Sequence, residues 1–294
     1  MEPDLLVLRD GDGATAWGLL VRNEQGDWFQ PPRTVAVAAS HIGDGAVRPV
    51  GSGAVRVAGA DFEDLHERIQ RDGAVQGWAT VTGIWSGDHL RVERQVPQGR
   101  KPVRLPSWTV PPCPPPPGGW PDVISGGDSP LHYDIGDLRV TGTLIALTLF
   151  RPAEHKAVLV VAAADRAAVE ARLRPQLADC LCVVPSRWTR AELDSVTSHL
   201  HDRHDEWNVY QWGQSSTQDG QACITASLTR VLPEIAAWAA SLPDGLLVLE
   251  PWLSYLPGSI GLLIRSLVQS VRLVRRSPFR QARVYRLSSA YGQI

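Results

Sequence analysis

The chain has 294 residues, which is enough for two domains with separate hydrophobic cores. Its composition, 44% hydrophobic and 20% charged, is typical of a folded globular protein and excludes intrinsic disorder. No apolar run reaches the length of a membrane-spanning helix, so we expect no transmembrane segment. The first residues, Met1-Glu2-Pro3-Asp4, are acidic and are followed by no apolar signal-peptide core, so we expect a cytoplasmic protein with reduced cysteines.

The net charge of −2 conceals an asymmetry along the chain. After Glu250 there is no acidic residue but there are seven arginines, so the tail carries +7 and residues 1–250 carry −9. An acidic body disfavours a nucleic-acid surface, because nucleic acids are polyanions. The tail is therefore the place where we expect electrostatic attraction to an acidic partner.

Residues 1–96 are predicted to form a β-rich domain, because short apolar runs alternate there with Gly, Asp and Pro. One helix is predicted within it, with Asp61 as its cap and Phe62, Leu65 and Ile69 as its buried stripe. A closing hairpin turns at Ser86-Gly87-Asp88. This order is compatible with an OB-like barrel, the oligonucleotide/oligosaccharide-binding fold. The predicted strands are 5–8, 14–22, 34–39, 54–57, 77–85 and 89–96.

Two tryptophans of the closing hairpin, Trp78 and Trp85, are candidate binding residues. Aromatic rings on the face of such a barrel can stack on nucleic-acid bases or on sugars. The alternative is that both rings pack in the core of a half-buried hairpin.

Residues 97–130 contain 11 of the 23 prolines, including the run Pro111-Pro112-Cys113-Pro114-Pro115-Pro116-Pro117. Proline fixes φ and removes a hydrogen-bond donor, which predicts an extended polyproline II segment. The segment is either a stiff linker, a ligand for an aromatic groove, or a strap packed on its own protein. Trp108 and Trp120 favour the strap, because a free linker would leave both large apolar rings in water.

Residues 131–256 are predicted to form a ferredoxin-like α/β domain. Strands are expected at 138–150 and 157–163, followed by a helix that Asp165 caps and that Pro175 should kink or shorten. Residues 181–250 then read as strand, helix, strand, strand, helix, strand, which is the split-βαβ order. The first of these helices opens with the capping box Thr189-x-x-Glu192, and Pro233 opens the second. The predicted fold class is therefore α+β.

Three motifs connect the chain to a family. They are the turn Trp85-Ser86-Gly87-Asp88, the stretch from Pro111-Pro112-Cys113-Pro114 through Gly118-Gly119-Trp120-Pro121, and Leu181-Cys182-Val183 at the start of the α/β unit. With them, residues 75–250 resemble a protein family of high-GC bacteria that has no established activity. The resemblance implies no catalytic residue and no cofactor.

Residues 257–294 are predicted to form a basic amphipathic helix and tail. Apolar residues from Ile260 to Val274 share one helical face, and Arg272, Arg275 and Arg276 lie largely off it. Such a helix can pack on its own acidic body or on another copy, bind an acidic protein partner, or lie on an anionic membrane surface. Nucleic acid is a further partner that the arginines allow.

The motifs of P-loop, zincin and α/β-hydrolase sites are absent from the sequence. The strongest polar cluster runs from His199 to Glu206, where only His201, His204 and Asp205 lie close enough on a helix to converge. They are a candidate metal site and suggest a metal-dependent hydrolase. A solvated helix end with favourably placed histidines is the simpler interpretation.

Cys180 and Cys182 flank Leu181 and should share one face of a strand. They are read as buried free thiols, with a soft-metal or redox pair as the alternative. We expect no cofactor and no catalytic residue. The leading hypothesis is a non-enzymatic binding or interaction protein, and the alternatives are nucleic-acid or oligosaccharide binding through the OB-like domain and the metal-dependent hydrolase.

Overall fold

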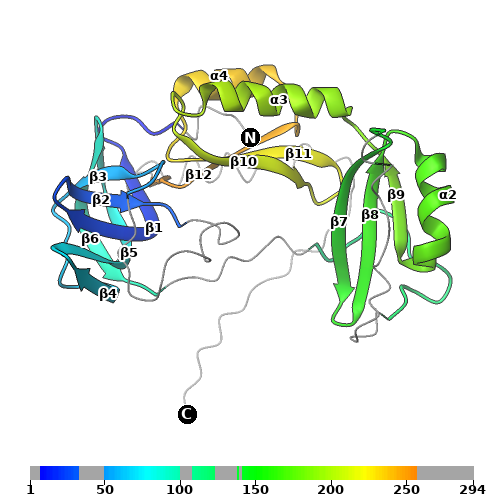
Figure 1. Cartoon of the computed structure of the whole chain (residues 1–294), viewed down its shortest axis with the longest axis horizontal. Helices are drawn as coiled ribbons and strands as arrows, with labels where there is room; N and C mark the ends of the chain where they lie inside the picture. Colours follow the sequence, from blue (N-terminus) through cyan, green and yellow to red (C-terminus); the bar gives the residue numbers. More distant parts are fainter. Residues whose placement is uncertain (1–6, 33–49, 100–107, 123–137, 139–140, 257–294) are drawn as a thin grey trace, which may run out of the picture. The chain divides into compact units, whose positions relative to one another are not determined.

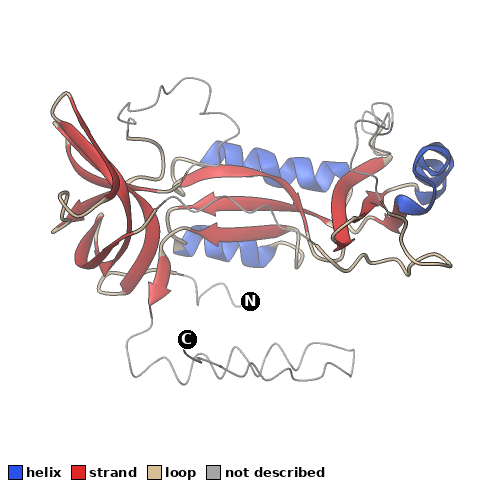
Figure 2. Cartoon of the chain, turned by 90° about the horizontal axis from the view of Figure 1, so that it is seen from below, coloured by secondary structure: helices blue, strands red, loops and turns tan. Residues whose placement is uncertain are grey.

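The computed structural model describes residues 7–32, 50–99, 108–122, 138 and 141–256, and the fold is mixed α+β, as predicted (Figures 1 and 2). Met1–Tyr255 form one compact unit and Leu256–Ile294 a second. The candidate tail residues Arg272, Arg275 and Arg276 lie outside the described residues. In the part of the chain that is described, no helix has both the length and the apolar composition needed to span a bilayer.

Five strands of the N-terminal part close into a ring. β1 pairs with β2, β2 with β3, β3 with β6, β6 with β5, and β5 returns to β1. All of these pairs are antiparallel except β3 and β6, which run parallel. The ring encloses a core that includes Phe29, Ala79, Val81 and Leu90. The bounds are β1 Gly13–Asn23, β2 Gly26–Gln30, β3 Val55–Ala58, β5 Ala74–Ser86 and β6 His89–Pro97.

The helix predicted from Asp61 to Ile69 is wrong, because these residues form a turn followed by β4, His66–Arg71. The Asp61 carboxylate accepts a hydrogen bond from the Glu63 N–H at 2.8 Å, two residues on, and so closes an Asx turn instead of capping a helix. Asp72 and Gly73 then turn with φ of 51° and 77°. A two-residue turn with both φ values positive joins antiparallel strands, so β4 pairs with β5.

A second sheet contains β7 (Leu144–Ala153), β8 (Lys156–Ala163) and β9 (Leu181–Pro185). α2 (Arg166–Leu177) packs on one face of this sheet through Val169, Leu173 and Leu177. The predicted cap is confirmed, because Asp165 accepts from the Ala168 N–H at 3.0 Å. The helix continues through Pro175 and ends two residues later, where a 3₁₀ turn, Ala178–Cys180, leads into β9.

A third sheet has the order β10-β11-β12, and α3 and α4 cover one of its faces (Figure 1). The capping box of Thr189 and Glu192 and the position of Pro233 at the start of α4 are both confirmed. The predicted order of strands and helices is present, but a single ferredoxin-like sheet is not confirmed, because β9 pairs with β8 in the second sheet. The bounds are α3 Arg190–Arg203, β10 Val209–Ser216, β11 Ala222–Leu228, α4 Pro233–Ser241 and β12 Leu247–Pro251.

The ring of strands is joined to the third sheet by backbone and side-chain hydrogen bonds. The Thr229 hydroxyl donates to the Gly53 carbonyl at 2.9 Å, and the Trp252 indole N–H donates to the Trp17 carbonyl at 2.8 Å. After β12, the chain adds β13 (Ser254–Leu256) beside β1 in the N-terminal sheet. Residues 252–255 therefore belong structurally to the N-terminal part, although the sequence places them in the α/β domain.

Candidate functional site

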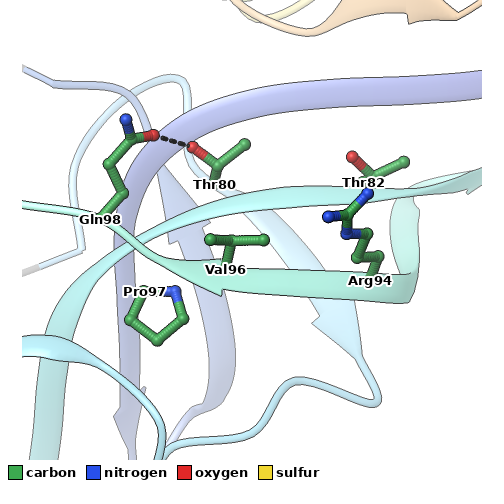
Figure 3. A pocket seen from close by; sticks show the side chains of 6 residues that line it. All are labelled: Thr80, Thr82, Arg94, Val96, Pro97 and Gln98. Atoms are coloured by element: carbon green, nitrogen blue, oxygen red, sulfur yellow. Dashed lines mark hydrogen bonds between the residues drawn. The ribbon is translucent and has the colours of Figure 1, made fainter. Parts of the chain in front are cut away.

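An open pocket of about 340 Å³ lies on the outer face of β5 and β6 (Figure 3). This volume falls within the range of small-molecule sites. Its lining combines hydroxyl, amide and guanidinium groups with an exposed aliphatic side chain, Val96, which is 41% exposed. The lining residues are Thr80, Thr82, Arg94, Val96, Pro97 and Gln98.

Strand alternation places the two threonines outside the ring. Ala79 and Val81 point into the core, so Thr80 and Thr82 point to the opposite face. On the neighbouring strand, Val96 is the partner of Thr80 and Arg94 is the partner of Thr82. Four of the five lining side chains on these strands therefore come from two directly opposed pairs, and the fifth is Pro97 at the end of β6.

A β-bulge brings Arg94 to this face. The register of β6 shifts between the pairs Gly83–Val92 and Thr82–Arg94, so Glu93 is an additional residue in β6. Leu90 and Val92 therefore point toward the core, whereas Arg94, two residues later, points outward. The bulge needs a glycine opposite it, because a Cβ on Gly83 would lie 2.1 Å from the Arg91 carbonyl oxygen.

Hydrogen bonds hold the polar side chains of the pocket in place. The Thr80 hydroxyl donates to the Gln98 Oε1 (Figure 3). The Thr15 and Thr82 hydroxyls lie 3.0 Å apart. The Gln98 carbonyl accepts from the Trp17 indole at 3.3 Å. In contrast, the Arg94 guanidinium and the Gln98 Nε2 make no hydrogen bond or ion pair with any described residue. The pocket therefore has unpaired hydrogen-bond donors, the Arg94 guanidinium and the Gln98 amide, beside hydroxyl groups that hydrogen bonds hold in place.

Trp78 and Trp85 do not form a shared stacking platform. They are seven residues apart on one strand, so they point to opposite faces, since side chains alternate with a period of two. Trp85 is 3% exposed in the core of the ring, with the Arg230 guanidinium 4.9 Å from its ring. Trp78 is 6% exposed and stacks on Trp17, with 4.9 Å between the ring centroids.

Trp108 and Trp120 pack on the second sheet, on the face that α2 leaves uncovered. Between them, Cys113 forms a disulfide with Cys182 of β9. This bond corrects the expectation that all cysteines are reduced and that Cys180 and Cys182 are both free thiols on one face of a strand. Cys180 lies in the 3₁₀ turn and not on the strand, and its thiol is free and buried.

The free thiols are poor nucleophiles. Burial raises the pKa of Cys180, and it raises the pKa of Cys223 to about 11, with Glu250 and Asp219 acting in the same direction. Since the thiolate is the reactive form, neither residue is activated near neutral pH.

The histidine cluster lacks the geometry of a metal site. His204 and His201 have ring centroids 5.8 Å apart, and the His204 Nδ1 lies 2.7 Å from the His201 carbonyl oxygen. Its Nε2 faces Asp205 at 3.4 Å, so both ring nitrogens already have neighbours. Among the described residues, no three His, Cys, Asp or Glu side chains are grouped to hold a metal ion.

The pocket residues were not among the candidates read from the sequence. The signal was present in part, since Thr80 and Thr82 sit at alternate positions of a predicted strand and so share a face. The face of β6 on which Arg94 lies depends on the bulge at Glu93, and no residue pattern in the sequence predicts this bulge.

Comparison of the chain with protein-family models, with curated protein sequences and with solved structures finds no match.

Proposed function

We propose that this protein is a non-enzymatic binding protein, and that its ring of five strands is an OB-like barrel whose β5–β6 pocket binds an acidic oligosaccharide. The strand order supports the barrel assignment. Counted along the chain, the ring strands follow the order first, second, third, fifth, fourth, with the third and fifth parallel. A five-stranded Greek-key ring of this kind is the OB architecture.

The single observation that carries the proposal is the combination of groups in the pocket. Thr80, Thr82 and Gln98 provide hydrogen-bonding groups at fixed positions, and Val96 provides an apolar surface. A sugar has rows of hydroxyls, which match the hydrogen-bonding groups, and an apolar C–H face, which matches Val96. Arg94 adds one unpaired cation, which suits one carboxylate of a uronic acid.

An oligosaccharide is favoured over a nucleic acid. Binding of a polyanion needs several cations that neutralise successive phosphates, and Arg94 is the only cation lining the pocket. Residues 1–250 carry −9, which opposes a nucleic acid further. The loops that grip oligonucleotides in OB folds are two-residue turns here, at 24–25 and at 87–88.

The test is an NMR titration of the full chain with a tetrasaccharide that contains glucuronic acid. Open sugar sites bind weakly, and we expect a Kd of about 1 mM, which NMR measures well. Amide signals of residues 80–82 and 94–98 should shift. Arg94→Gln should weaken binding by about tenfold, because it removes a charge-assisted hydrogen bond. Arg91→Gln is the matched control, since Arg91 lies on the same strand outside the pocket.

A neutral glucose tetrasaccharide and a ten-nucleotide single-stranded DNA complete the titration. The neutral sugar should bind wild type and Arg94→Gln equally and weakly. If only the DNA shifted the amide signals of residues 80–98, the ligand of the pocket would be a nucleic acid and not an oligosaccharide. No shifts with any of the three probes would refute the pocket as the binding site.

The arginine tail supports a second candidate function, binding of an acidic protein partner or self-association. The observation in its favour is the charge segregation, +7 after Glu250 against −9 before it. Association should weaken with salt and on deletion of residues 259–294. Identical association of the truncated and full-length chains in native mass spectrometry would show that the tail does not bind the partner.

A further inference from the structure

Residues 108–122, which we call the strap, form the second cover of the sheet β7-β8-β9. At one end Trp108 bridges to Phe150, and its carbonyl accepts from the Arg151 N–H at 2.7 Å. At the other end the Trp120 carbonyl accepts from the Lys156 ammonium, which also lies 3.4 Å from the Asp122 carboxylate. The strap is therefore fixed at both ends to β7 and β8.

The surface beneath the strap is strongly apolar. Phe150, Val158 and Val160 are all 0% exposed, and they pack against Trp108, Trp120 and Cys113. α2 packs on the opposite face of the same sheet. Without the strap, Phe150 and Val158 would lose their cover and be open to water, which favours non-specific association.

The middle of the strap has little backbone support. Seven of its 15 residues are proline, which has no N–H to donate. Within the strap, the turn at Gly119 closes on the Pro116 carbonyl at 2.9 Å. The covalent bond from Cys113 to Cys182, with Cα atoms 5.8 Å apart, is what joins this middle part to β9.

We propose that the Cys113–Cys182 disulfide holds the strap closed on the sheet. This chain then needs an oxidising compartment to complete its fold, and a dithiol opens the strap again. In the closing direction the two thiols lose two protons and two electrons to a small-molecule disulfide such as oxidised glutathione, which is reduced to two thiols. In the opening direction a dithiol attacks one sulfur, forms a mixed disulfide, and leaves as a cyclic disulfide with Cys113 and Cys182 as thiols.

The two sulfurs differ in access, which sets the route of opening. Cys182 is 1% exposed, whereas Cys113 is only partly buried. An external thiolate therefore reaches the Cys113 sulfur and releases Cys182 as the leaving group. Structural disulfides persist in oxidising compartments and are rare in the cytosol, so the cytoplasmic location expected from the sequence is replaced by an oxidising one.

The first measurement is a thiol count on the full chain refolded in a glutathione redox buffer. In denaturant we expect two free thiols of four cysteines, and peptide mapping should give one cross-link, between Cys113 and Cys182. Four free thiols, a cross-link that involves Cys180 or Cys223, or a disulfide between two chains would each overturn the proposal.

The second measurement compares the oxidised protein with the dithiol-treated protein and with the double variant Cys113→Ser/Cys182→Ser. Reduction and the double variant should each lower Tm by about 5–15 °C. Both should speed hydrogen exchange in residues 108–122 and 156–163 and increase binding of a fluorescent apolar dye. Cys180→Ala is the matched control: it should keep the cross-link and leave strap exchange slow. If hydrogen exchange in the strap did not change after reduction, the disulfide would not be what holds the strap closed, whatever the thiol count.

Discussion

Thr82 of β5 and Arg94 of β6 are directly opposed partners, and the register slips by one residue immediately beyond them. This slip places a guanidinium on the outer face of the ring of strands, where strict alternation from Leu90 would have placed an inward-pointing side chain. The candidate site thus depends on one bulge and on the glycine that faces it.

Gly83→Ala should destabilise the protein and disturb the pocket. The new Cβ would lie 2.1 Å from the Arg91 carbonyl oxygen, so the bulge must shift. We expect the free energy of unfolding to fall by about 1–3 kcal/mol, as for an overpacked core. Gly213→Ala is the control, because its Cβ would meet no atom within 4 Å; its stability should stay the same or rise by up to about 1 kcal/mol. Chemical denaturation of both variants measures this, and equal stabilities would contradict it.

Arg230→Met should weaken the contact between the ring of strands and the α/β sheets. The Arg230 guanidinium donates to the Leu8 carbonyl at 3.1 Å and lies 4.9 Å above the Trp85 ring. Methionine keeps much of the apolar stem but leaves that carbonyl without its donor. A loss of about 1–3 kcal/mol is expected in urea unfolding. Arg91→Met, at an exposed position, should change stability by less than about 0.5 kcal/mol; a similar loss in both variants would show that the Leu8 contact is not the cause.

The capping box at the start of α3 predicts a pH dependence. Hydrogen bonds from the Thr189 N–H and hydroxyl lower the pKa of Glu192 below its ordinary value of 4.5. A lowered carboxyl pKa contributes stability that is present above 4.5 and is lost as pH falls through the folded-state pKa. Thr189→Ala should lower Tm by about 2–4 °C at pH 7 and move the Glu192 pKa upward in an NMR titration. Thr189→Ser, which keeps the hydroxyl, should change neither; a Glu192 pKa that is the same in all three proteins would refute this.

Cys223 should resist alkylation in the folded protein. Its side chain is 2% exposed, and burial raises its pKa to about 11. At pH 8 the thiolate fraction is therefore about a thousandth of the thiol. Iodoacetamide should label Cys223 in denaturant but not in the native protein, as read by mass spectrometry. Equal labelling in both states would show that β11 opens readily.

Local signals predicted the helices well, and long-range pairing decided the rest. Three helix starts were predicted from residues near in sequence, at Thr189, Asp165 and Pro233, and all three starts were confirmed. The stripe of Phe62, Leu65 and Ile69 suits a helix as well as a turn and an edge strand, and the Asx turn of Asp61 decided for the latter. The separation of β9 from β10 depends on pairing with β8, which no local pattern encodes.

The candidate site was less predictable than the fold. The odd spacing of Trp78 and Trp85 was enough to separate the two rings, since seven steps along a strand end on the opposite face. The role of Cys113 was hidden because 69 residues separate it from Cys182. Proline content pointed to an extended segment, but only the covalent bond and the packing of Trp108 and Trp120 show which surface it covers.

The most direct test of the binding proposal is the NMR titration of wild type, Arg94→Gln and Arg91→Gln with the glucuronic-acid tetrasaccharide. Shifts confined to residues 80–82 and 94–98, with about tenfold weaker binding in Arg94→Gln alone, are the predicted result. Shifts elsewhere on the chain, or equal affinity in all three proteins, would contradict it.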